Sequence, residues 1–148
     1  MTTVKISQME ATRLLEMAKK SLTSDFYIPS MGNDKEFCVI GDTKKDIFVI
    51  NIFRGSVNRL KYNMGARIKK NGIMLLELHI NPSNVHINPN GEKIVGSHWH
   101  IYSEEYGRGW AFSANDITAD EFVKNTITFL DRFNVLEQPK VNFQLELL

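Results

Sequence analysis

The sequence predicts a single α+β domain, residues 1–148, in which a mostly antiparallel sheet of about five to seven strands carries a helix near each end of the chain. Apolar residues follow the 3.6-residue helical period in 7–23 and again in 118–133. Between these segments, short runs alternate in polarity and are separated by turn sequences such as Asn71-Gly72. We therefore expect both helices to pack on the sheet.

Each predicted helix begins with a capping box, in which a hydroxyl residue is followed three positions later by Glu. Ser7 and Glu10 open the first helix, which we expect to end at Thr23. Thr118 and Glu121 open the second helix, which we expect to end at Phe133. The expected strands cover 37–40, 47–53, 59–69, 73–80, 97–103, 110–112 and 141–147.

The overall composition is that of a globular protein, with 43% hydrophobic and 24% charged residues. The single cysteine, Cys38, excludes a disulfide within the chain. No apolar run approaches the ~20 residues that a membrane span needs, so no membrane association is expected. No signal sequence is recognised at the N-terminus, and we expect a cytoplasmic protein.

Positive charge is concentrated in the middle of the chain. Between Ile47 and Leu76 there are six basic residues and no acidic residue, whereas the remainder has 12 basic and 17 acidic residues. Within this block, 59–69 alternates strictly, which places four cations on one strand face: Arg59, Lys61, Arg67 and Lys69. A basic face on an otherwise acidic chain predicts a local anionic partner such as RNA.

All four histidines lie between positions 79 and 100. In the expected strand 97–103, His98, His100 and Tyr102 share one face. The segment 81–96 before this strand is a long predicted loop, and long loops in compact domains often carry function.

Three interpretations of the histidines remain open. In the first, His98 and His100 are the acid–base pair of a metal-independent ribonuclease and Tyr102 assists, while Arg59, Lys61, Arg67 and Lys69 bind phosphate. This is the leading hypothesis, and it requires no metal and no cofactor.

In the second interpretation, His98 and His100 bind a metal ion in a small metal-dependent enzyme, with His79, His86 or Glu104 as further ligands. The spacing His98-x-His100-x-x-x-Glu104 resembles the first metal motif of cupins, although the second cupin motif is absent. In the third, the histidines are a polar sheet face and the basic strand binds a host protein, a cognate protein or nucleic acid without catalysis.

The stretch from Asn88 to Phe112 resembles a family of uncharacterised proteins of about this length from Firmicutes and their mobile elements. The resemblance rests on Asn88-Pro89-Asn90-Gly91-Glu92-Lys93-Ile94, Gly96, His98, His100-Ile101-Tyr102, Glu105-Tyr106-Gly107 and Trp110-Ala111-Phe112. It implies a bacterial or phage protein and supplies no reaction. By analogy of fold and context, such proteins are often RNA-cleaving toxins or inhibitors of a host defence.

Overall fold

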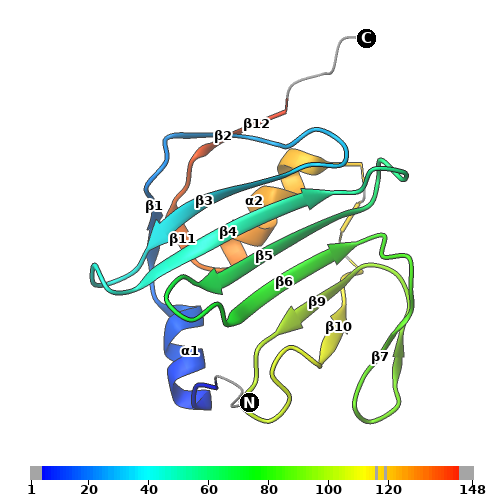
Figure 1. The fold of residues 1–148 in the computed structure, drawn as a ribbon, viewed down its shortest axis with the longest axis horizontal. Coiled ribbons are helices and arrows are strands. Elements are labelled where there is room, and N and C mark those ends of the chain that lie inside the picture. The colour runs from blue at the N-terminus through cyan, green and yellow to red at the C-terminus, as the bar shows by residue number, and fades with distance from the viewer. Residues whose placement is uncertain (1–4, 116, 119, 144–148) are drawn as a thin grey trace.

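The fold is described from a computed structural model, which covers residues 5–115, 117–118 and 120–143 (Figure 1). Its elements in chain order are α1 (Gln8–Glu16), β1 (Lys19–Ser21), β2 (Asp25–Tyr27), β3 (Asp34–Ile40), β4 (Ile47–Arg54), β5 (Tyr62–Ile68), β6 (Met74–Ile80), β7 (His86–Ile87), β8 (Lys93–Ile94), β9 (His98–Ile101), β10 (Ala111–Ser113), α2 (Phe122–Arg132), β11 (Val135–Glu137) and β12 (Lys140–Asn142).

Eight strands form the main sheet in the order β10-β9-β6-β5-β4-β3-β1-β11. All neighbours are antiparallel except β1 and β11, which are parallel. Two further pairs, β2 with β12 and β7 with β8, form separate small sheets. The predicted α+β class is therefore confirmed, with a main sheet one strand larger than the expected range.

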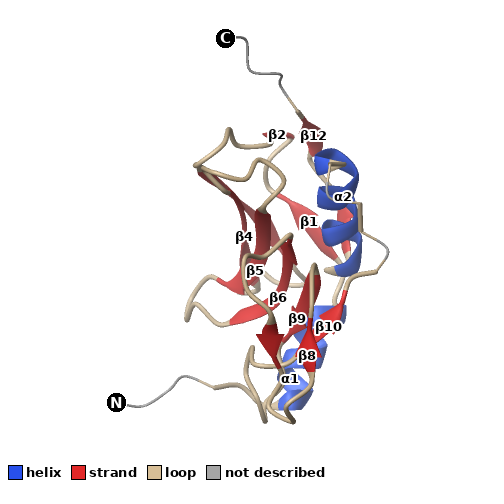
Figure 2. Ribbon diagram, turned by 90° about the vertical axis from the view of Figure 1, so that its right-hand side faces the viewer, coloured by secondary structure: helices blue, strands red, loops and turns tan. Residues whose placement is uncertain are grey.

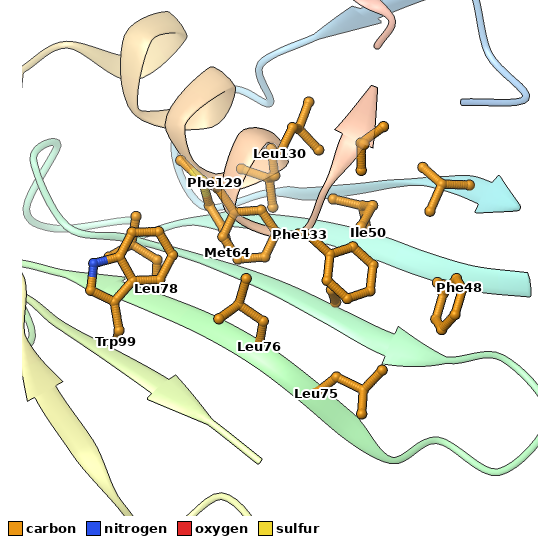
Figure 3. Packing of buried hydrophobic residues seen from close by; sticks show 14 of the residues in the cluster. Phe48, Ile50, Met64, Leu75, Leu76, Leu78, Trp99, Phe129, Leu130 and Phe133 are labelled. Atoms are coloured by element: carbon orange, nitrogen blue, oxygen red, sulfur yellow. The ribbon is translucent and has the colours of Figure 1, made fainter. Parts of the chain in front are cut away.

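One face of the main sheet is covered by α2, as Figure 2 shows in a side view. The core lies between them (Figure 3), where the Trp99 ring stacks on Phe129 with centroids 6.1 Å apart. One turn further along, Phe133 at the C-cap of α2 packs edge to face with Phe48, with ring centroids 5.3 Å apart. Burial of these large side chains against the sheet fixes which face of each strand points to α2.

The pairing of β5, β6 and β9 places the alternate residues of three strands on the face opposite α2. His79 pairs with Asn63 on one side and with His98 on the other. Glu77 pairs with Gly65 and with His100 in the next row. The predicted basic strand and the predicted histidine strand thus belong to one sheet, with β6 between them.

The first helix is shorter than predicted. It ends at Glu16, because Met17 adopts an extended backbone with φ −62° and ψ 145°. The chain then forms β1 between β3 and β11, and Leu22, expected on the buried helical stripe, is 58% exposed. The Ser7 cap is confirmed, since the Glu10 amide donates to the Ser7 hydroxyl at 3.1 Å.

The second helix also differs at its start. It begins at Phe122 with Glu121 as N-cap, and no side chain caps it, so the predicted capping box of Thr118 and Glu121 is wrong. The predicted loop 81–96 contains β7 and β8. Of the predicted final strand, only residues up to 143 are described, and β12 occupies part of them; Leu145 and Leu147 lie outside the described residues.

The ammonium of Lys19 joins the ends of the two helices inside the core. It donates to the backbone carbonyls of Leu15, Met17 and Phe133 at 3.2, 3.0 and 2.7 Å, and it lies 3.9 Å from the Phe133 ring centroid. Burial lowers the pKa of Lys19 to about 7. The three carbonyl acceptors favour the charged form, so we expect Lys19 to act as a structural cation below about pH 7.

Lys19→Met should therefore destabilise the fold by about 2 kcal/mol, because three buried carbonyls lose their donor. The measurement is urea unfolding followed by circular dichroism. Lys20→Met is the matched control, since Lys20 is the next residue of β1 and is exposed. Equal stability of the two variants would show that the Lys19 ammonium does not hold the helix ends.

Candidate functional site

A pocket of about 440 Å³ opens on the sheet face opposite α2, under the loop that carries β7. All four histidines of the chain line it. The other lining residues are Lys61, Asn63, Pro82, Ser83, Asn84, Val85 and Arg108. Sheet strands therefore supply one wall and the loop supplies the other.

The four imidazole rings form one cluster. His79, His98 and His100 project from β6 and β9, with ring centroids 4.8 to 5.1 Å apart. His86 comes from β7 in the loop, and its centroid lies 4.8 Å from that of His100 and 5.6 Å from that of His98. His98 and His100 are 2% and 6% exposed, so the part of the cluster on β9 is buried.

Backbone carbonyls fix the orientation of three of the rings. The Nδ1 of His98 lies 2.9 Å from the Gly96 oxygen, and that of His100 lies 2.8 Å from the Arg108 oxygen. The Nε2 of His86 lies 2.9 Å from the Gly109 oxygen. A carbonyl oxygen only accepts, so each of these nitrogens must carry the proton. In the neutral ring the other nitrogen then keeps a lone pair.

A buried carboxylate orients the fourth ring. The Oε1 of Glu77 lies 3.2 Å from the Nε2 of His79, and Glu77 is 3% exposed. Arg108 donates its Nε to Glu77 Oε2 at 2.8 Å and its terminal nitrogen to Oε1. Burial would raise the pKa of Glu77, but the hydrogen bond from His79 and the charge of Arg108 outweigh it and leave the pKa lowered. The ionised carboxylate accepts from Nε2, which leaves the lone pair of His79 on Nδ1.

The histidines on β9 are neutral near pH 7. Burial, and after it the neighbouring His79, lowers the pKa of His100 to about 4. The pKa of His98 is lowered for the same first reason, burial. Neutral imidazole is the form that binds a metal ion. It is also the form that cannot donate a proton as a general acid.

Three of the rings are close enough to share one ion. One ring nitrogen each from His79, His98 and His100 lies within 4.8 Å of the other two. Each of these rings has its second nitrogen bound to a carbonyl or a carboxylate, which is the usual outer shell of a metal-binding histidine. The residues present thus fit a divalent transition metal that prefers nitrogen ligands.

The remaining predicted site residues are dispersed. Tyr102 is in the core, and its hydroxyl bonds to the backbone of Ile6 at 3.1 Å, away from the histidines. Tyr102 follows the end of β9 at Ile101 and does not line the histidine pocket. Among the four basic residues, Lys61 alone lines the histidine pocket, where its Nζ donates to the Ser83 hydroxyl at 2.7 Å.

The other three basic residues lie elsewhere. Arg59 is in the turn before β5 and lines a different pocket beside α2 that also contains Asp120. Arg67 shares the sheet face with the histidines but forms an ion pair with Glu36 at 3.0 Å. Lys69 is exposed in the turn after β5. The continuous basic row expected from the sequence is thus interrupted.

Two segments that sequence reasoning did not assign to the site hold it together. The adjacent carbonyls of Arg108 and Gly109 orient His100 and His86, respectively. The buried Asn88 amide pairs with the backbone of Ala111 in β10, accepting from its N–H at 2.7 Å and donating to its oxygen at 3.0 Å. Asn88 therefore anchors the loop to the sheet edge, and the Asn-Pro-Asn-Gly turn sequence was the available signal.

Fold and pocket together define an α+β protein with a histidine cluster on the open face of its sheet. Residues 6–135 match the model of a family of unknown function, DUF6978, and the chain belongs to this family. No match was found among curated proteins or among solved structures. The expected resemblance to an uncharacterised family is confirmed, while the link to Firmicutes and mobile elements stays a prediction. No helix in the described part of the chain is long and apolar enough to cross a membrane.

Asn88→Ala should loosen the loop that carries His86, because Ala111 loses a donor and an acceptor in a buried setting. We expect a loss of about 1–3 kcal/mol in unfolding free energy and faster amide exchange in 81–96. Hydrogen exchange with mass spectrometry measures the second effect. Asn84→Ala, an exposed position in the same loop, is the control. Unchanged exchange in Asn88→Ala would contradict the anchoring role.

Proposed function

We propose that this chain is a metal-dependent enzyme in which His79, His98 and His100 bind a divalent transition metal ion. The observation that carries the proposal is the set of three converging rings, each with one nitrogen already committed to a fixed acceptor. Because the committed nitrogen holds the proton, the other nitrogen of each ring has the lone pair that a metal ligand needs. Zinc is the ion we favour, since it takes three histidines together with a water.

This geometry supports a metal better than a metal-independent acid–base pair. Such a pair needs one protonated imidazole, and the buried His100 is neutral until the pH approaches its pKa of about 4. The His98 and His100 rings are also only 4.9 Å apart between centroids. That separation leaves little room for a phosphodiester between them, whereas one ion needs far less space.

A catalytic ion is favoured over a structural one. The sheet and α2 already bury a core of large apolar side chains on the opposite face, so the fold does not need a structural metal ion for its stability. The cluster instead opens into a pocket of about 440 Å³, a size typical of small-molecule sites. An ion with three protein ligands keeps a position for water and lowers the pKa of that water to about 7. Hydrolysis is the reaction class that follows.

His86 has a separate role in this proposal. It reaches the cluster from the loop, and its Nδ1 is free because Nε2 is bound to the Gly109 oxygen. It is close to His98 and His100, yet it is not part of the group of three nitrogens. We assign His86 the role of general base, which would accept a proton on Nδ1 from a water that a bound ion activates.

The purified, chelator-treated chain should bind about one Co²⁺ or Zn²⁺ ion per molecule, as expected for a three-histidine site. His79→Ala, His98→Ala and His100→Ala should each weaken binding about 100-fold or more, because each removes a ligand. His86→Ala should bind the ion within about tenfold of the parent chain. Visible absorption of the Co²⁺ form and metal analysis of the Zn²⁺ form are the measurements.

Two results would contradict the assignment of a catalytic metal site. Absence of stoichiometric metal binding would favour the non-catalytic, partner-binding interpretation of the histidine face. A loss in His86→Ala as large as in His98→Ala would make His86 a fourth ligand and close the coordination sphere, which favours a structural ion.

The ribonuclease hypothesis makes a different prediction with the same protein. If His98 and His100 were an acid–base pair, cleavage of total bacterial RNA would survive addition of a chelator. We expect no chelator-resistant cleavage, because the neutral pair lacks a general acid. Gel analysis of the RNA, with His98→Ala run alongside, decides between the two chemistries.

A further inference from the structure

The histidine pocket carries positive side chains at both of its ends. Lys61 lies two residues before Asn63 on the same face of the sheet, and Asn63 pairs with His79. Arg108 lies at the other end, where it bonds to Glu77, the residue that pairs with His100. The cluster, and with it the proposed ion, therefore lies between two cations.

Glu77 neutralises Arg108, but among the described residues no carboxylate pairs with Lys61. Among the residues that line the pocket, all of them in the described part of the chain, there is no Asp or Glu. Glu77 is buried, and its two oxygens already accept from Arg108 and His79. Lys61 has no carboxylate partner among the described residues, and its Nζ bonds only to the Ser83 hydroxyl. The charge of Lys61 is thus available to a ligand.

Neutral hydrogen-bond donors surround the end of the pocket at which Lys61 lies. Ser83 and Asn84 reach the pocket from the loop, and Asn63 reaches it from β5. Together with the ammonium, they offer several donors from two walls. A tetrahedral dianion with three free oxygens uses such a set more fully than a planar carboxylate does.

We propose that the substrate of this site carries a phosphate group, which Lys61, Asn63 and Ser83 hold beside the metal ion. The inference rests on the proposed metal site and names the substrate class for it. The phosphate belongs to a small molecule rather than to a long nucleic acid. Arg67 is neutralised by Glu36 and Arg59 lies in another pocket, so within the described residues no continuous basic track leads away from Lys61.

The test uses the Co²⁺-loaded chain and inorganic phosphate as the probe. Phosphate should change the visible absorption of the bound Co²⁺ in a saturable manner. In Lys61→Met, the phosphate dissociation constant should rise about tenfold or more, because a charge-assisted contact is lost. Lys69→Met is the matched control, since Lys69 follows the same strand but lies outside the pocket. Its phosphate affinity should stay within about twofold of the parent chain.

Metal content and melting temperature of Lys61→Met show whether the variant is intact, and both should match the parent chain. Acetate and a single-stranded RNA oligomer without terminal phosphates are the competing probes. The inference is overturned if Co²⁺ is bound but phosphate leaves its absorption spectrum unchanged. It is also overturned if Lys61→Met and Lys69→Met weaken phosphate binding to the same extent. Acetate binding as tightly as phosphate indicates a carboxylate substrate, and tighter binding of the oligomer indicates nucleic acid; either result also overturns it. If Co²⁺ does not bind at all, the proposed metal site fails, and the inference fails with it.

Discussion

The candidate site depends on the register in which β6 pairs with β9. In this register His79 lies beside His98 and Glu77 beside His100, while the residue between the two histidines, Trp99, is buried against Phe129. A shift by one residue would turn Trp99 to the open face and both histidines into the core. The apolar contact with α2 on one face therefore determines the polar cluster on the other.

Hydrogen bonds on the polar face explain how the chain tolerates a buried cluster of imidazole rings. Unpaired buried imidazoles would cost stability, but every ring has one nitrogen bonded to an acceptor. Two of those acceptors are the adjacent carbonyls of Arg108 and Gly109. Gly109 suits this position because a Cβ there would lie 3.0 Å from the Tyr106 oxygen. The turn between β9 and β10 is thus part of the site, although its residues do not themselves bind the ion in our proposal.

Alternation along the strands was enough to predict which strand residues share a face. It placed His98 with His100 and Lys61 with Arg67, and the antiparallel pairing then brought both sets to one sheet face. Alternation gives no guide beyond the end of a strand, and Tyr102, which follows β9, does not line the histidine pocket. The position of His86 was not predictable in the same way, because it depends on the Asn88 amide, which binds a strand edge 23 residues along the chain. The first helix was predicted too long because the burial of Lys19 in β1 arises only through tertiary contacts.

Glu77 connects the two chemical parts of the site. Its carboxylate accepts from His79, a proposed ligand, and from Arg108, one of the two cations that flank the pocket. The side chain of Arg108 thus holds Glu77, while its backbone oxygen holds His100. Any movement of Arg108 towards a bound anion would be transmitted through Glu77 to His79 and through the main chain to His100. Metal binding and anion binding are therefore expected to be coupled energetically, since both use the same short network of hydrogen bonds.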